Sequence, residues 1–282
     1  MKKVFIVLVL LSSLFITACG GDENTDKVKI IDIKLTNEEY AFVCKKGNTE
    51  LINDFNAFLE EIKENGKFNE ILAKYFEGNR EKQGYPITTS AVLNTENNFV
   101  IATNCPFEPF EYVGTDGLIY GVDIEIAALF AESQGLELII KNILFDSILG
   151  DVDAGYSDMG MAGITITDDR LALYDFTTAY YQASQKLIVA ADNTYFDDCK
   201  TKEDVENKIK SLQNEKIGFQ IGTTGNWYVV GGEWDFEGYP NVVAKGYSTA
   251  QLAIQDIVNG QIYGVIVDEA PANAIVKAIN NA

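Results

Sequence analysis

Two blocks of alternating strand-like and helix-like segments constrain the fold of this 282-residue chain more than any other feature of its sequence. The blocks cover residues 28–78 and 98–282, and in both of them apolar residues change between the two-residue period of strands and the spacing of helices. Residues 79–97 lie between the blocks, lack such a period and contain Gly84 and Pro86 among Thr, Ser and Asn residues. The alternation predicts open α/β sheets, and residues 79–97 are the best candidate for a linker.

The individual segments are assigned from their period and from their capping residues. The predicted strands cover residues 28–33, 41–44, 99–103, 136–140, 158–163, 185–191, 216–219 and 262–267. The predicted helices cover residues 51–62, 68–76, 122–134 and 269–279, and three more begin near residues 201, 224 and 248. Thr201 and Asp204 have the spacing of a helix N-cap box, and so do Ser248 and Gln251. Because the first predicted element is a strand and the last is a helix, the end of the chain can lead directly into its start.

The first residues have the composition of an export signal. The basic start MKK is followed by an apolar run over residues 4–16 and by ITAC at residues 16–19. The run is too short for a membrane-spanning helix and, after a basic start, predicts a secretory signal. ITAC resembles the bacterial lipoprotein box, which implies that residues 1–18 are removed, that Cys19 is lipidated and that residues 19–27 form a flexible tether. An ordinary cleaved signal with an incidental Cys is the alternative.

The composition excludes several classes of partner. A formal charge of −20 disfavours nucleic acid and anionic membrane patches and is typical of a soluble extracytoplasmic surface. Three cysteines follow the first one, namely Cys44, Cys105 and Cys199; an odd number cannot all pair, and the spacing is not that of a metal site. The chain has no His, which removes the commonest general base and metal ligand. At most one disulfide is expected, and neither a metal nor a cofactor.

Six motifs in the second block follow one another in the order of a known family. They are NFVIATNCPFEPFEY at residues 98–112, GVDIE at 121–125, MGMAGITITDDR at 159–170, DFTTAYY at 175–181, QIGTTG at 220–225 and VIVDEAP at 265–271. With these motifs the chain resembles the polar amino-acid-binding proteins of ABC importers, the bacterial extracellular solute-binding proteins of family 3. The resemblance implies a periplasmic-binding-protein-like type II fold, in which two α/β lobes joined by hinge strands close around a ligand.

The order of the remaining segments departs from that family. Residues 35–48 and 66–76 resemble its closing strand and terminal helices, which normally follow the region of Asp268. The simplest explanation is a circular permutation, in which residues 79–97 join the original ends. A linker of these 19 residues reaches roughly 60 Å when extended, which is enough to join surface termini. The alternative is a relic of a tandem pair, which would leave Phe55 and its apolar neighbours without a partner core.

The permutation defines two lobes and moves the tether. The first lobe would contain residues 42–78 and 98–185, and the second lobe residues 28–41 and 186–282. The hinge strands are expected near residues 40–43 and 183–187. Because the tether enters the strand at residues 28–33, the protein would hang from the membrane by the second lobe, whereas ordinary relatives start in the first lobe.

The resemblance also implies which residues bind the charged groups of an amino acid. Arg170 would hold the carboxylate through two parallel N–H bonds, which a Lys cannot copy, and Asp268 would accept the ammonium. The carbonyl of Gly163 and the side chain of Thr165 would complete these contacts. Thr224, in a Gly-rich turn at a helix start, would offer N–H groups to the carboxylate. Two alternatives stay open, because Arg170 could pair with Asp at 168 or 169 and Asp268 could simply cap the following helix.

Four more residues are expected near the side chain of the ligand. Phe107 and Phe145 resemble the two aromatic walls that enclose it, with core packing as the alternative for each. Asn104 lies where some relatives have an Asp, and a neutral residue there argues against a strongly basic ligand. Gln220 lies near the contacts of the second lobe. These residues favour a neutral polar amino acid.

The sequence therefore predicts a lipid-anchored, monomeric receptor on the extracytoplasmic face of the cell membrane. It would bind a free amino acid and present it to the membrane subunits of an ABC permease, without enzyme activity. One alternative is a ligand-binding sensor domain that acts through a partner protein. Another is a cyclohexadienyl-dehydratase-like enzyme on the same fold, which needs a general acid in the cleft, such as Glu108 or Glu269.

Overall fold

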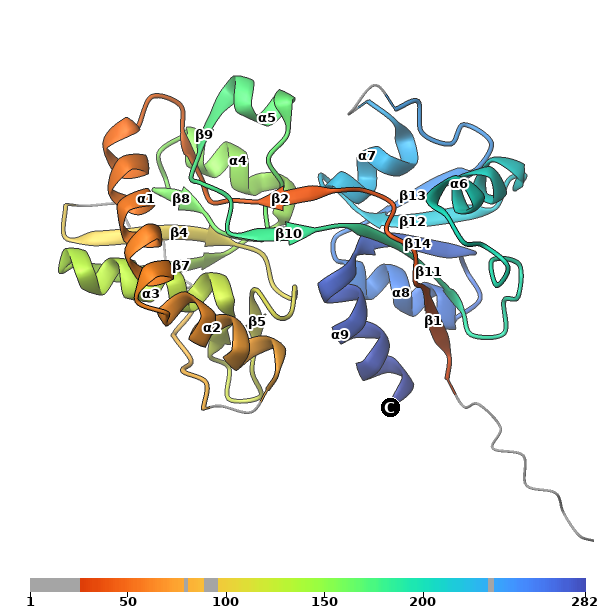
Figure 1. Ribbon diagram of the computed structural model, residues 1–282, viewed down its shortest axis with the longest axis horizontal. Coiled ribbons are helices and arrows are strands. Elements are labelled where there is room, and N and C mark those ends of the chain that lie inside the picture. The colour runs from red at the N-terminus through yellow and green to blue at the C-terminus, as the bar shows by residue number, and fades with distance from the viewer. Residues whose placement is uncertain (1–25, 79–80, 89–95, 233–235) are drawn as a thin grey trace, which may run out of the picture.

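A computed structural model describes residues 26–78, 81–88, 96–232 and 236–282 of the chain. These residues form two α/β lobes that lie side by side and are joined by two extended crossing segments (Figure 1). The two-lobed α/β architecture agrees with the fold class expected from the sequence. The predicted signal peptide, Cys19 and most of the tether lie outside the described residues.

The first lobe is built on a five-stranded sheet with the strand order β7-β4-β8-β3-β9. Its strands are β3 (Val43–Lys45), β4 (Asn98–Thr103), β7 (Glu137–Asn142), β8 (Met159–Gly160) and β9 (Tyr174–Phe176). Its helices are α1 (Thr49–Glu64), α2 (Lys67–Phe76), α3 (Val122–Gln134), α4 (Phe145–Asp153) and α5 (Asp168–Leu173), and a small pair of strands adds β5 (Tyr112–Val113) and β6 (Ile119–Tyr120). Strand β3, from the first sequence block, lies between β8 and β9, which come from the second block, and runs antiparallel to both.

The second lobe has its own five-stranded sheet, with the order β1-β11-β14-β12-β13. Its strands are β1 (Val28–Ile31), β11 (Gln185–Ala190), β12 (Lys216–Gln220), β13 (Val243–Tyr247) and β14 (Gly264–Asp268). Its helices are α6 (Lys202–Ser211), α7 (Thr224–Val230), α8 (Ala250–Val258) and α9 (Glu269–Asn280). Strand β1 pairs antiparallel with β11, with Val28 opposite Ala190. The first block thus supplies strands to the sheets of both lobes.

Two short antiparallel strands cross between the lobes, β2 (Glu38–Tyr40) and β10 (Tyr181–Ala183). The sequence places these crossings a few residues too late, at 40–43 and 183–187. The reason is that Val43 and Leu187 already belong to the sheets of the two lobes. An apolar run at residues 40–43 leads from β2 into β3, whereas mostly polar residues lead from β10 into β11, so the two crossings share no hydrophobic pattern that would mark them.

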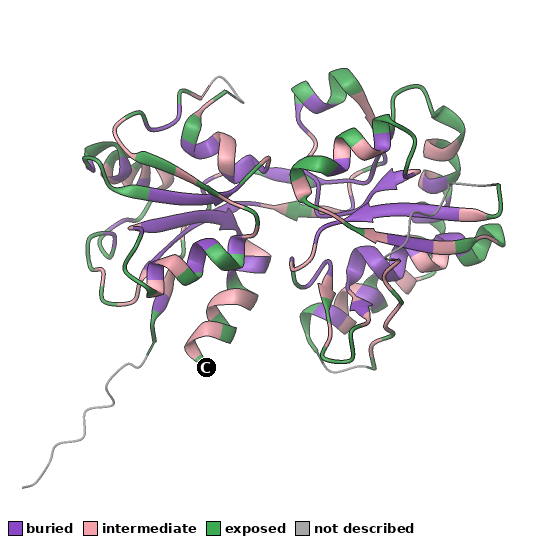
Figure 2. Ribbon diagram, turned by 180° about the vertical axis from the view of Figure 1, so that it is seen from behind, coloured by how far each residue is buried: buried purple, intermediate pink, exposed green. Residues whose placement is uncertain are grey.

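Apolar side chains of the first block are buried against the second block. The ring of Phe55 lies 4.4 Å from that of Phe130 and 6.3 Å from that of Phe99, and Phe58 and Leu59 are buried beside it. Buried residues follow the sheets of both lobes in Figure 2. Burying a side chain of this size stabilises a fold by about 1.5–3 kcal/mol. The second block thus provides the partner core for these side chains.

The end of α9 is in direct contact with the start of β1. The Asn280 side chain accepts hydrogen bonds from the backbone N–H groups of Lys27 (2.9 Å) and Val28 (3.2 Å), and it donates one to the carbonyl of Val28 (2.9 Å). The described part of the predicted linker packs on the first lobe, where Tyr85 and Ile119 exchange two backbone hydrogen bonds. Both ends of the linker region therefore lead into the first lobe.

The structure confirms one predicted helix cap and corrects another cap and one strand. Thr201 and Asp204 form the expected reciprocal capping box of α6. The cap of α8 is Thr249, whose hydroxyl accepts from the N–H of Leu252, and not its neighbour Ser248. The strand expected at 158–163 is reduced to β8, because the chain leaves the sheet after Gly160 to build a loop between the lobes.

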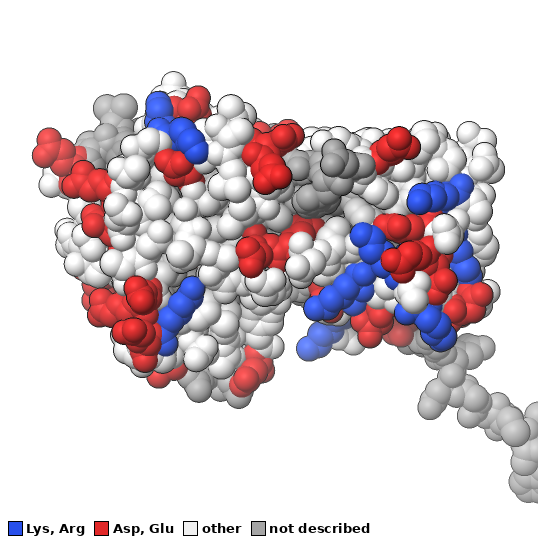
Figure 3. All heavy atoms as spheres, turned by 45° about the horizontal axis from the view of Figure 1, so that its top comes forward, with Lys and Arg blue, Asp and Glu red and all other residues white. Residues whose placement is uncertain are grey.

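The surface of the described residues carries charges of both signs. Acidic side chains are spread over both lobes in Figure 3, with Lys and Arg side chains among them. None of the helices in the described ranges is long and apolar enough to cross a membrane. Cys44, Cys105 and Cys199 are free thiols.

Candidate functional site

The loops that face each other across the crossing strands enclose a small, almost filled cavity between the lobes. Its lining includes eight of the nine residues expected at the site, together with Thr223. The first lobe supplies Phe107, Phe145, Gly163, Thr165 and Arg170, and the second lobe supplies Gln220, Thr223, Thr224 and Asp268. Asn104, the ninth expected residue, lies next to the cavity and contacts Gln220.

Arg170 is buried, with 4% of its surface exposed, and its guanidinium reaches across the cleft. Its Nη1 donates to the carbonyl of Thr165 (2.7 Å) and its Nη2 donates to the carbonyl of Gly222 in the second lobe (3.1 Å). The guanidinium carbon lies 4.7 Å from the ring centroid of Trp227 and 5.9 Å from that of Phe145. The two rings hold the planar cation by cation–π attraction. Trp227 was not expected from the sequence, because an aromatic residue in a short helix is usually part of the core.

Asp268 ends β14 and occupies the N-cap position of α9, but its side chain makes no capping hydrogen bond there. Its Oδ1 instead accepts a hydrogen bond of 2.5 Å from the hydroxyl of Tyr40 on β2. Burial, and then the negative charge of Glu38, raise the pKa of Asp268 from 3.8 to about 7, and hydrogen bonds from Tyr40 and Gln185 oppose this rise. The carboxyl group is therefore held in the cleft and not used to begin the helix.

Glu38 is a buried carboxylate behind the cavity that the sequence did not single out. Only 2% of its surface is exposed. Its Oε1 accepts from the hydroxyl of Thr36 (2.6 Å), and its Oε2 accepts from the hydroxyls of Thr165 (2.7 Å) and Thr224 (2.8 Å). These last two threonines belong to opposite lobes. The only signal in the sequence was the position of Glu38 inside the segment at 35–48.

The loop of the first lobe is fixed from behind by a second buried carboxylate. Gly163 has a φ of 55°, a conformation that favours glycine. Its N–H donates to Asp123 (3.0 Å), whose other oxygen accepts from the hydroxyl of Tyr180 (2.6 Å). Burial raises the pKa of Asp123 to about 7. With its N–H engaged in this way, the carbonyl of Gly163 is the remaining polar group of that residue at the cavity.

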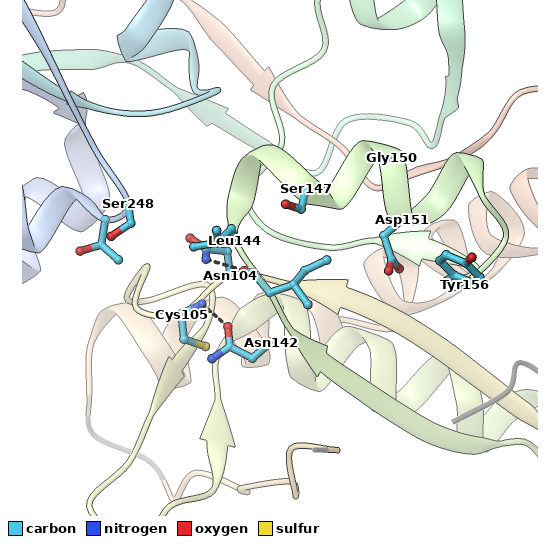
Figure 4. Close-up of a pocket in the computed structure, with 11 residues that line it drawn as sticks. Asn104, Cys105, Asn142, Leu144, Ser147, Gly150, Asp151, Tyr156 and Ser248 are labelled. Carbon is cyan, nitrogen blue, oxygen red and sulfur yellow. Dashed lines mark hydrogen bonds between the residues drawn. The ribbon is translucent and has the colours of Figure 1, made fainter. Parts of the chain in front are cut away.

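Two amide side chains separate the inner cavity from a wider outer pocket. Gln220 Nε2 donates to Asn104 Oδ1 across the lobes (2.7 Å), and Asn104 Nδ2 donates to the carbonyl of Ile143 (2.6 Å). The outer pocket, shown in Figure 4, is lined on one side by polar and apolar residues of the first lobe, such as Ser147 and Leu144, and on the other by Ser248 and Thr249. Asn104 therefore forms part of the wall of this pocket.

The cavity combines a buried cation, a buried carboxyl group, hydroxyl groups and two aromatic rings. An amino acid carries a carboxylate and an ammonium on neighbouring atoms, and binding both out of water requires partners of opposite charge on each side. No group of three His, Cys, Asp or Glu side chains that could hold a metal occurs in the described ranges. Glu108 and Glu269, the acids named for an enzyme alternative, line a separate groove.

Two sheet-containing lobes, paired crossing strands and a cavity between them define a two-lobed binding protein of the type II class. The chain belongs to the bacterial extracellular solute-binding proteins, family 3, whose sequence model matches residues 99–280. Strands β1, β2 and β3 and helices α1 and α2 lie outside this match, although they belong to the two lobes and to the crossing between them.

The chain is similar to several characterised members. It is 31% identical over 180 residues to the ABC transporter arginine-binding protein 1 of Escherichia coli K12, covering 64% of this chain and 66% of the relative. It is 28% identical over 178 residues to the L-cystine-binding protein TcyJ of the same organism, covering 62% and 60%. The chain thus spans less than two thirds of the length of these relatives. The solved structure of holo ArgBP from T. maritima superimposes with a TM-score of 0.56 and 27% identity, over 64% of this chain and 74% of that one.

Proposed function

We propose that this protein is the amino-acid-binding receptor of an ABC importer. The observation that carries the proposal is the presence of Arg170 and Asp268 in one small cavity to which both lobes contribute. Similarity to proteins that bind arginine and cystine supports it. The receptor captures a free amino acid between its lobes as a monomer and presents it to the membrane subunits of the permease. The amino acid leaves unchanged, because the proposed role is binding and not catalysis.

Each charged group of the amino acid has a partner in this proposal. The guanidinium of Arg170 holds the carboxylate, and N–H groups at the start of α7, near Thr224, support it from the second lobe. Asp268, Thr165 and the carbonyl of Gly163 hold the ammonium. Because each lobe supplies part of the site, the amino acid binds the closed form better and shifts the population toward it.

The side chain of the amino acid would lie between Phe107 and Phe145 and point toward Asn104 and Gln220. The two rings supply apolar contact. The two amides supply both donors and acceptors but no charge. This environment favours a polar side chain without a full charge, which is the ligand class that we propose.

A thermal-shift panel of the purified protein with each of the twenty amino acids tests the proposed function. A molecule that binds only the folded state raises the melting temperature by mass action. We expect a rise with one or a few polar amino acids, and no rise for the Arg170→Ala variant. A cooperative melt that responds to none of the twenty would contradict the proposal.

The circular permutation is a second proposal, and it concerns the origin of the fold. Its support is that α9 contacts β1 through Asn280, so a chain running from residue 282 into residue 28 needs only a short connection. A gene that encodes residues 98–282 followed by residues 28–78 tests it. We expect this rearranged protein to fold and to bind the same amino acid with similar affinity. The control is the protein with its original segment order and a varied sequence at residues 79–97. An insoluble or inactive rearranged protein would count against the permutation.

We also propose that Cys19 is lipidated and anchors the mature protein to the outer face of the cell membrane. The family is extracellular by its description, which supports export. The tether would then enter the second lobe through β1. A Cys19→Ser variant should leave the membrane fraction, whereas Cys105→Ser should stay in it; equal partition of the two variants would refute the anchor.

A further inference from the structure

The carboxylate of Glu38 lies one layer behind the cavity, on the strand that crosses between the lobes. It is not part of the lining, but it accepts hydrogen bonds from two hydroxyls that are, those of Thr165 (2.7 Å) and Thr224 (2.8 Å). Thr165 belongs to the first lobe and Thr224 to the second. One oxygen of Glu38 therefore joins both lobes at the cavity.

These hydrogen bonds decide what the two hydroxyls can offer to a bound molecule. A hydroxyl has one hydrogen to donate and two lone pairs to accept with. Thr165 and Thr224 each give their only hydrogen to Glu38. Thr224 also accepts from Nε2 of Gln185 (3.0 Å), so it keeps one lone pair, and Thr165 keeps two. Toward the cavity both hydroxyls can therefore only accept.

We infer that Glu38 is a positioning residue, which turns the hydroxyls of Thr165 and Thr224 into acceptors for an ammonium group and does so only when the lobes are closed. This inference rests on the proposed function and refines it. It assigns the Thr224 hydroxyl to the ammonium end of the amino acid, leaving the backbone N–H groups of its turn for the carboxylate.

The negative charge of Glu38 also acts on Asp268. The other ionisable groups that face Asp268 are Tyr40 on β2, Tyr181 on β10, Glu269 on α9, which is paired with Lys186 of β11, and Arg170 across the cavity. Burial is the largest cause of the raised pKa of Asp268, about 7, and Glu38 is the second. An ammonium bound there favours the ionised form of Asp268, so the affinity for an amino acid should fall as the pH drops below about 7.

Three substitutions on β2 test this role. Glu38→Gln removes the charge, Glu38→Asp keeps the charge but shortens the reach to the two hydroxyls, and Glu39→Gln is the matched control. Glu39 is the next residue on the strand and is exposed, and among the contacts described its carboxylate accepts a hydrogen bond only from the side chain of Gln182 (2.7 Å). The probe is the amino acid that gives the largest thermal shift with wild-type protein, titrated calorimetrically between acidic and mildly alkaline pH.

We expect Glu38→Gln to bind this amino acid about tenfold or more weakly at neutral pH, because both hydroxyls lose a charged acceptor. The pH at which its affinity falls should also be lower than in wild type, because the charge that raises the pKa of Asp268 is gone. Glu38→Asp should lose affinity while keeping the wild-type pH dependence, and Glu39→Gln should match wild type in both. Unchanged affinity in both Glu38 variants, or weaker binding of Glu38→Gln with an unchanged pH dependence, would overturn the inference.

Small-angle scattering without any amino acid separates this inference from the proposed function. If no amino acid binds wild-type protein, the proposed function fails on its own. Because Glu38 joins both lobes, Glu38→Gln should have a larger radius of gyration than wild type and Glu39→Gln. Equal radii for the three proteins would overturn the role of Glu38 in closure, whatever the binding result.

Discussion

Replacing Asp268 by Asn should stabilise the protein without ligand and abolish amino-acid binding. The carboxyl group is buried, with 5% of its surface exposed, and it lies near the buried carboxylate of Glu38. Asn has nearly the same shape, and its side-chain oxygen can still accept the hydrogen bond from Tyr40. The substitution therefore removes the charge with little change in packing.

The size of the effect follows from the pKa of Asp268. The folded protein has a pKa of about 7 for this group, whereas an unfolded chain has the ordinary value of 3.8. Below pH 3.8 the group is protonated in both states, so it does not affect the free energy of unfolding. As the pH rises from about 4 to 7, the unfolded chain loses the proton first, and stability falls by about 1.4 kcal/mol per pH unit. At pH 8 the cost is about 4 kcal/mol, of which Asp268→Asn should recover a large part.

Urea unfolding at pH 4 and at pH 8, with protein freed of amino acids by dialysis, measures this effect. The variant should match wild type at pH 4 and be clearly more stable at pH 8. Asp256→Asn is the control. Asp256 lies at the surface of α8, and its hydrogen bonds with Tyr247 and Lys245 lower its pKa. Replacing this carboxylate should therefore destabilise the protein slightly at pH 8. An Asp268→Asn variant that is less stable than wild type at pH 8 would refute the electrostatic reasoning.

Three further substitutions test other parts of the structure. Arg170→Lys should weaken amino-acid binding by about tenfold to a hundredfold in calorimetry, since an ammonium cannot make the two parallel bonds of a guanidinium; near-native affinity would contradict the assigned role. Asn280→Ala removes three hydrogen bonds to residues 27 and 28 and should lower the free energy of unfolding by about 1–2 kcal/mol in urea, with affinity unchanged. An unaltered unfolding midpoint would mean that this contact does not hold β1 to α9. Gly163→Ala places a methyl group 2.6 Å from the ring of Phe107 on a backbone with positive φ, so both affinity and melting temperature should fall, and a wild-type profile would rule out the tight loop described.

Cavity residues could be predicted from the sequence where the residue type and the surrounding motif both indicated a role in the site. Arg170 follows a turn inside a long motif, and Asp268 ends a buried strand, so each could be assigned without knowing its neighbours in space. The structure brings these residues together with six others of the expected set. Asn104 is the member of the expected set that does not line the cavity. It lies beside the cavity and contacts Gln220, which does line it.

Glu38 and Trp227 could not be predicted, because their surroundings come from distant parts of the chain. Glu38 lies in a short polar segment that resembles an exposed loop, and it is buried only because β2 crosses between Thr165 and Thr224. Trp227 faces Arg170 only because the lobes are close together. The cap of α8 was missed for a simpler reason: Ser248 and Thr249 are neighbouring hydroxyl residues, and a shift of one position exchanges their roles.

Equilibrium dialysis tests the central claim most directly. Purified wild-type protein is dialysed against an equal mixture of the twenty amino acids, and both chambers are analysed by mass spectrometry. One or a few polar amino acids should be enriched, chemically unchanged, in the protein chamber, and the enrichment should disappear with Arg170→Lys and Asp268→Asn. Equal concentrations in the two chambers with folded wild-type protein, or enrichment that both variants retain, would contradict a receptor that holds its amino acid between Arg170 and Asp268.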